Sequence, residues 1–244
     1  MKAKAVCSIL SPATNPDPPQ EIAICPSRLL SSNLTQILPM LLDMQDPLLL
    51  NEVSVPSSNG GKAFQIDLVL VDLVDPTTKI AAIEVQAVYT TGGGLGEQLN
   101  ALSQTGTISS DCKTIGIDWR SSGAKRLLPQ IDAEWNVFTN AGIRLCILAQ
   151  ANLFPMLPPD LPRANHIGES RFRNSLGSDK IVVAVVEDPG DPRSSHRPFE
   201  QITFVAATYQ QVRDALMAGT QTTPELVLAA IEKNVQRDYN PNKG

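Results

Sequence analysis

Short apolar runs with a period of two alternate along the chain with longer stretches in which apolar residues recur every three or four positions. The first pattern predicts strands and the second predicts helices. Strands are expected at residues 53–55, 64–74, 80–89, 143–148, 181–186 and 202–206, and helices at 124–138, 209–217 and 224–235. Strands flanked by helices, with a hairpin in the middle, predict an α/β or α+β fold around a mixed β-sheet.

The helix at 124–138 carries its apolar side chains on one face, and Asn140-Ala141-Gly142 is a sequence that ends a helix. Residues 33–42 also show helical spacing, although Pro39 is expected to kink or delimit that helix. Residues 151–178 are rich in proline, arginine and asparagine, and they are predicted to form a loop.

Length and composition narrow the class of protein. The chain has 244 residues, of which 42% are hydrophobic and 18% charged, so a largely disordered chain is excluded. We expect a single domain over residues 1–244. No apolar run is long enough for a membrane span, and the N-terminus has no clear cleavage site, so a cytoplasmic protein without membrane contact is expected. Four cysteines are too few for a secreted disulfide framework.

The net charge of −5 argues against a protein that coats nucleic acid through its overall field, but it permits a local basic surface. Lys125 and Arg126 form such a group at the start of a predicted helix. Cations at that end oppose the helix dipole, which favours a phosphate partner over the alternative, a solvated helix start. Both residues are therefore candidate DNA contacts.

Two polar residues interrupt the apolar run Ile80-Ala-Ala-Ile-Glu-Val-Gln86. A hairpin turn centred on Pro76 and Thr77 would place Asp67 opposite Gln86 and Val69 opposite Glu84. Alternation then puts Asp67, Glu84 and Gln86 on one face. The opposite face receives the apolar residues Ile66, Leu68, Leu70, Ile83, Val85 and Ala87.

Paired carboxylates on neighbouring strands offer hard oxygen ligands that suit Mg²⁺. A bound Mg²⁺ can polarise a phosphodiester and lower the pKa of a water molecule, whereas Gln86 can position water but cannot carry a proton. The alternative interpretation is a solvated outer face of an antiparallel hairpin.

The stretch F-Q-I-D-L-V-L-V-D-L-V followed by I-E-V-Q resembles the hairpin of the PD-(D/E)xK nucleases in its E-x-Q form. Further pieces resemble, in the same order, type II restriction endonucleases of the NotI type. These pieces are A-V-C-S, I-C-P-S-R-L-L, A-K-R-L-L-P-Q and D-K-I-V-V-A-V-V-E-D with the two closing helices.

The resemblance implies that Asp67 and Glu84 bind the metal and that Gln86 takes the place usually held by lysine. It also implies Mg²⁺-dependent cleavage of double-stranded DNA at a palindromic site by a homodimer. Glu52 is a candidate for a further acid of this fold, although an exposed strand residue is an equal alternative. Two other functions stay open: a repair or structure-specific nuclease of the same fold, and a non-catalytic DNA-binding or interaction protein.

The same resemblance makes residues 1–30 the end of a cysteine metal-binding segment. The family has four cysteines ahead of the hairpin that hold a structural metal, iron or zinc, whereas here only Cys7 and Cys25 precede it. Because closed structural sites need four ligands, metal binding at these two thiols is expected to be weak. We expect the chain to be shorter at its N-terminus than its relatives. Cys112 and Cys146 are predicted to be ordinary buried thiols.

The glycine-rich stretch 91–96 lacks the lysine and serine or threonine of a phosphate-binding loop, so nucleotide binding is disfavoured. His166 and His196 stand in separate polar loops without an acid or cysteine at ligand spacing, and exposed histidines are expected.

Overall fold

The six predicted strands and one short strand that the sequence did not predict form a mixed seven-stranded sheet, in the order β3-β4-β5-β8-β10-β11-β9. A computed structural model describes residues 8–10, 21–24, 26–30, 32–56, 58–60, 62–91, 116–118, 122–154, 156–164, 170–187, 202–218 and 224–238. The sheet strands are β3 (Pro47–Pro56), β4 (Lys62–Asp72), β5 (Ile80–Gln86), β8 (Arg144–Gln150), β9 (Arg163–Ala164), β10 (Lys180–Val186) and β11 (Ile202–Thr208). This architecture confirms the predicted α/β class.

The centre of the sheet is parallel and its flanks are antiparallel. Strand β8 pairs in parallel with both β5 and β10, whereas β3-β4, β4-β5, β10-β11 and β11-β9 are antiparallel pairs. Six of the seven residues in each of β5, β8 and β10 are buried. Parallel strands need such cover on both faces, which explains their nearly continuous apolar sequences.

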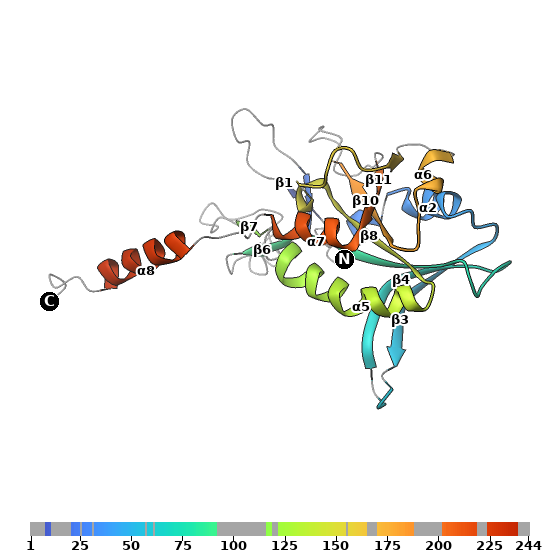
Figure 1. Ribbon diagram of the computed structural model, residues 1–244, viewed down its shortest axis with the longest axis horizontal. Coiled ribbons are helices and arrows are strands. Elements are labelled where there is room, and N and C mark those ends of the chain that lie inside the picture. The colour runs from blue at the N-terminus through green and yellow to red at the C-terminus, as the bar shows by residue number, and fades with distance from the viewer. Residues whose placement is uncertain are drawn as a thin grey trace, which may run out of the picture.

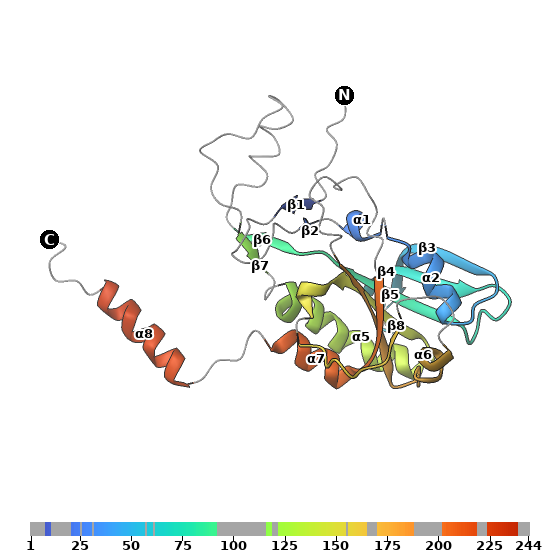
Figure 2. The ribbon, with the colours of Figure 1, turned by 90° about the horizontal axis from the view of Figure 1, so that it is seen from above.

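Helices cover one face of the sheet with an apolar layer. They are a π-helical turn, η1 (Gly123–Leu127), the helix α5 (Leu128–Asn140) that follows it, and α7 (Tyr209–Met217). Leu127, Ile131 and Phe138 share one buried cluster with Ile147 of β8 and Val212 of α7. Figure 2 shows α5 and α7 side by side beneath the strands.

The other face is covered by short helices from two separate parts of the chain (Figures 1 and 2). They are α1 (Pro26–Leu29), α2 (Leu34–Leu41) and α6 (Ser170–Asn174). Leu38 and Phe172 pack there against Ile83 and Val182. Helix α2 continues through the buried Pro39 and ends two residues later, so the proline lies near its end as predicted.

Smaller elements complete the described chain. Two-stranded sheets form from β1 (Ser8–Leu10) with β2 (Glu21–Ala23) and from β6 (Tyr89–Thr91) with β7 (Gly116–Asp118). A 3₁₀ turn, η2 (Ala151–Leu153), follows β8. The prediction that 151–178 is entirely loop is wrong, because η2, β9 and α6 lie within it.

The last helix, α8 (Pro224–Asp238), lies apart from the sheet in both views (Figures 1 and 2). Its exposed apolar side chains are Leu226, Val227, Leu228 and Ile231. None of the described helices has the length and apolar character needed to cross a membrane.

Candidate active site

The turn of the central hairpin lies one residue earlier than the sequence predicted. The Lys79 N–H donates to the Asp75 carbonyl at 3.1 Å, and the Asp75 carboxylate accepts hydrogen bonds from two threonine hydroxyls, so Asp75 organises the turn. Leu68 consequently pairs with Ile83. Asp67 thus lies opposite Glu84, and the predicted pairings of Asp67 with Gln86 and of Val69 with Glu84 are wrong.

The error in register is an even number of residues, so it leaves the predicted faces almost unchanged. Leu68, Ile83 and Val85 belong to the cluster beneath α2, as expected. Ile66 is the exception, because it belongs to the cluster beneath α5. The alternation of β4 therefore changes between Ile66 and Leu68, at the position of Asp67.

The alternation of strand β3 between the two faces of the sheet also changes, at the position that faces Asp67. Asn51 pairs with Leu68 and Val53 pairs with Ile66, which leaves Glu52 facing Asp67. Glu52 has a φ of 52°, in the left-handed region that residues other than glycine rarely adopt. This backbone turn explains how Val53 joins the α5 side of the sheet, and it leaves the Glu52 side chain exposed.

Glu84 and Gln86 are buried, with exposures of 1% and 8%. The alternative interpretation of a solvated hairpin face is therefore wrong for these two residues. They point towards helix α5, which covers this side of the sheet. Asp67 is partly buried, and its Oδ2 accepts a hydrogen bond of 2.9 Å from the Val85 backbone N–H.

Helix α5 contributes two polar side chains to the same place. The Gln130 amide donates from Nε2 to Glu84 Oε2. Glu134 lies one turn later and is 1% exposed. The sequence reasoning missed both residues. A signal was present, because Glu134 falls at helical spacing within the buried stripe formed by Leu127, Ile131 and Phe138.

The three carboxylates at this site influence one another. Burial raises the pKa of Glu84 to about 9, and the negative charges of Glu134 and Asp67 add to that rise. Burial raises the pKa of Glu134 to about 7, while the neighbouring Gln130 and Glu84 side chains act in the opposite direction. Both directions follow from placing acidic groups together away from water.

Several carboxylate oxygens are buried without a hydrogen-bond partner in the part of the chain that the structure describes. They are Glu84 Oε1 and both oxygens of Glu134. Asp72, a buried acid on β4, provides a comparison, because its carboxylate has a structural role. It accepts hydrogen bonds from the backbone of Asp46, Gln45 and Val74, of which the first lowers its pKa most. Unpartnered buried oxygens point instead to a ligand.

This donor set fits a hard cation. Buried, unpartnered carboxylate oxygens are the ligand type that Mg²⁺ takes. Within the described ranges, however, no group of three or more histidine, cysteine or acidic side chains forms a complete metal site by itself. Magnesium sites commonly use one or two carboxylates and keep several water molecules, so Asp67 and Glu84 satisfy that requirement.

Gln86 is the third predicted site residue. Its Nε2 donates to the Ala87 carbonyl, which fixes the orientation of the amide. It stands two residues after Glu84 on β5, so its side chain leaves the same face of the strand.

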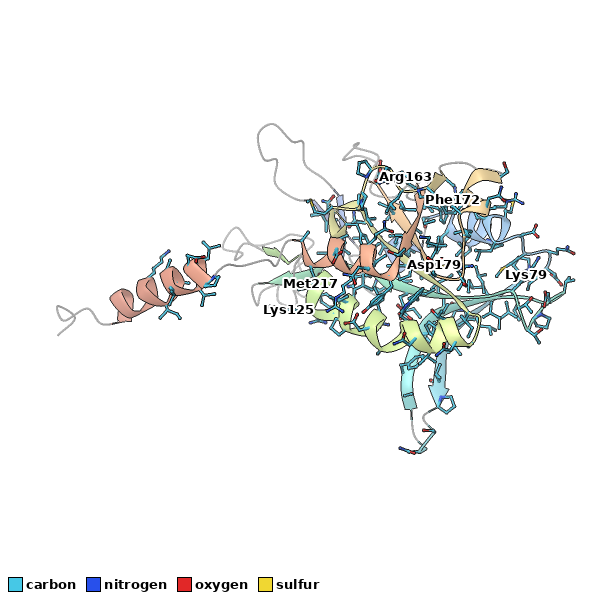
Figure 3. All side chains as sticks on the ribbon, in the orientation of Figure 1. Lys79, Lys125, Arg163, Phe172, Asp179 and Met217 are labelled. Atoms are coloured by element: carbon cyan, nitrogen blue, oxygen red, sulfur yellow. The ribbon has the colours of Figure 1, made fainter. Side chains whose placement is uncertain are left out.

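Lys125 and Arg126 are exposed on η1, at the end of α5 that leads into the site. The Arg126 guanidinium lies 3.5 Å from the centre of the Tyr89 ring. The Tyr89 backbone N–H donates to Ser122 Oγ at 2.8 Å. Because Tyr89 follows Gln86 by three residues, these contacts hold the basic group close to the end of β5. Figure 3 shows Lys125 and Lys79 on opposite sides of the molecule.

Cys146 is a free, fully buried thiol, and burial raises its pKa to about 12. The prediction of an ordinary buried thiol is confirmed for this residue.

Several other predicted features lie outside the described residues: the side chains of Cys7, Cys25, Cys112, His166 and His196, and most of the glycine-rich stretch.

Fold and site together define an α/β protein with a buried cluster of acids between a hairpin and a helix. The chain belongs to the NotI restriction endonuclease family, since the family model described as "Restriction endonuclease NotI" matches residues 2–172. That span includes β3 to β5 and α5, and hence every side chain of the cluster. No curated protein matches the chain. Family membership supports a restriction endonuclease that binds DNA.

Proposed function

We propose that the protein is a type II restriction endonuclease that hydrolyses phosphodiester bonds of double-stranded DNA at a palindromic site, with Mg²⁺ and as a homodimer. One observation carries the proposal. Asp67 and Glu84 lie opposite each other on the hairpin, and Glu84 keeps a buried oxygen without a partner. A site of this kind is stabilised when a cation and a phosphate enter it.

Each residue has a distinct part. Asp67 and Glu84 would hold Mg²⁺, which when bound lowers the pKa of water and neutralises charge on the phosphate. The Val85 N–H fixes Asp67, and Gln130 fixes Glu84. Gln86 accepts a hydrogen bond from water through its amide oxygen and orients it, since an amide cannot take up the proton.

The basic group on η1 serves binding. Lys125 and Arg126 would contact phosphates of the DNA backbone, with Arg126 kept in place by the Tyr89 ring. Such contacts position the duplex without reading its sequence. Glu52, opposite Asp67, is the remaining candidate acid, and its place on β3 would bring its charge towards the duplex side of the hairpin.

The test is a digest of plasmid and genomic DNA with Mg²⁺, alongside a chelator control and the Asp67→Asn variant as a control for contaminating nuclease. Discrete bands with a common end sequence are expected. A smear would indicate a structure-specific or non-specific nuclease of the same fold. Intact DNA in the presence of Mg²⁺ would contradict the proposal and favour a non-catalytic DNA-binding protein.

A further inference from the structure

Helix α5 carries an acid where its packing calls for an apolar residue. Leu127, Ile131, Glu134 and Phe138 follow one another at intervals of four, three and four residues and are all buried. Leucine or alanine at position 134 would pack there without placing a charge away from water. Glu134 instead has both oxygens without a partner in the described chain, beside Glu84 and Asp67.

We propose that Glu134 is a further residue of the cation site, an outer carboxylate that accepts hydrogen bonds from the water molecules a divalent cation carries, and that Gln130 positions Glu84. The inference rests on the proposed function for the nature of the cation. It goes beyond the hairpin residues, because it makes helix α5 part of the site.

The outer position follows from the geometry. The three acids come close enough to influence one another, yet among the described residues no three of them converge into a complete metal site. Magnesium keeps several of its waters, and those waters need acceptors. No hydrogen bond of standard geometry reaches either oxygen of Glu134 in the described chain, although Gln130 and Glu84 lie close enough to affect its pKa.

Gln130 has a separate task. Its amide donates to Glu84 Oε2, which leaves Oε1 of the same carboxylate without a partner among the described residues. One oxygen is thereby anchored to the helix and the other is directed into the site. Partners that orient a metal ligand in this way commonly contribute about 10- to 100-fold to metal affinity.

The test measures cation binding without DNA. Free Mn²⁺ is followed by electron paramagnetic resonance as it is titrated into the wild type, Glu134→Gln, Gln130→Met and the control Asp132→Asn. Asp132 is an exposed acid on the same helix, and methionine keeps the length of glutamine. Both site variants are expected to bind Mn²⁺ about 10- to 100-fold more weakly. Asp132→Asn is expected to bind like the wild type.

A purely structural role gives a different pattern. In that case Glu134→Gln would change the melting temperature in chelator but leave the Mn²⁺ affinity unchanged, and this result would overturn the inference. Melting curves of all four proteins therefore accompany the titration. An equal loss of affinity in Asp132→Asn would also overturn it, since the effect would then be one of overall charge.

Cleavage assays separate this inference from the proposed function. A wild type that cuts DNA with Mg²⁺, together with a Glu134→Gln variant that binds Mn²⁺ normally, would refute the role of Glu134 and leave the nuclease proposal standing. A wild type that cuts no DNA but loses Mn²⁺ affinity on Glu134→Gln would refute the nuclease proposal and keep the cation site.

Discussion

The backbone N–H of Val85 donates a hydrogen bond to the carboxylate of Asp67 across 2.9 Å. This single contact joins the two strands of the hairpin at the site and orients Asp67 beside Glu84. A side chain bound to the backbone of a neighbouring strand loses little freedom when a ligand arrives, so the acid pair is preorganised.

Asp67→Asn and Glu84→Ala are expected to reduce cleavage to background, because each removes a charge that would hold the cation. DNA binding should persist and become tighter, since less negative charge then faces the phosphates. Plasmid cleavage and a gel-shift assay measure the two effects, and circular dichroism verifies the fold. Asp160→Asn, which changes an exposed acid outside the hairpin, is the matched control and should cut normally. Normal cleavage by both site variants would show that Asp67 and Glu84 have no role in catalysis.

Gln86→Ala is expected to slow cleavage while leaving Mn²⁺ affinity within about twofold. The attacking water would no longer be oriented, but no charged metal ligand would be removed. Gln86→Lys should retain more activity than Gln86→Ala, because a lysine amine can also orient water. Single-turnover cleavage rates measure which of the two variants is more active. A Gln86→Ala variant with weakened Mn²⁺ binding would show that the amide is a metal ligand instead.

Replacing Lys125 and Arg126 by alanine should weaken binding to cognate and unrelated DNA alike. The slope of log affinity against log salt is expected to flatten by roughly one unit for each lost phosphate contact. Tyr89→Leu should reproduce part of this loss, because it removes the ring beneath Arg126. Lys79→Ala, on the far side of the molecule, serves as the control (Figure 3). An unchanged slope in the double variant would indicate a merely solvated helix start.

The raised pKa values predict how stability varies with pH in chelator. Glu84 has a pKa of about 9 in the folded chain against 4.5 ordinarily, so the folded state binds more protons between these values. The stabilisation is complete below pH 4.5 and is lost as pH rises towards 9. The melting temperature should therefore fall across this range in the wild type and fall less in Glu84→Gln.

At pH 8 in chelator, Glu84→Gln should be the more stable protein by about 1–3 kcal/mol, because unfolding lets the glutamate ionise in water whereas glutamine gains nothing in this way. For a chain of this size that corresponds to roughly 2–4 °C per kcal/mol in melting temperature. Differential scanning calorimetry gives both quantities. Identical pH profiles for the two proteins would mean that Glu84 is solvated in solution.

The sequence predicted most of the sheet because its central strands are short apolar runs bounded by turn residues. It also identified Glu84 and Gln86, since polar residues inside such a strand break the pattern. The pairing across the hairpin could not be predicted, because the Asp75 hydrogen bonds that move the turn depend on its folded shape. An error of two residues preserves the face and changes only the opposite neighbour.

Two further features depended on tertiary structure. The change of alternation at Asp67 lies opposite the left-handed backbone of Glu52, a conformation for which glutamate gives no sequence signal. Glu134 carried a signal in its helical spacing, but the spacing alone does not say that the stripe it interrupts faces Glu84. Only the packing of α5 on β5 and β8 brings helix and hairpin together.

The unpartnered oxygens of Glu84 and Glu134 also determine how this protein would respond to selection. In a library of variants selected only for expression and resistance to heat, glutamine or leucine at these positions should become enriched, because each removes a buried ionisable group. Under the proposed function, the same variants would no longer bind the cation. Screening for robustness alone would therefore erase the proposed cation site.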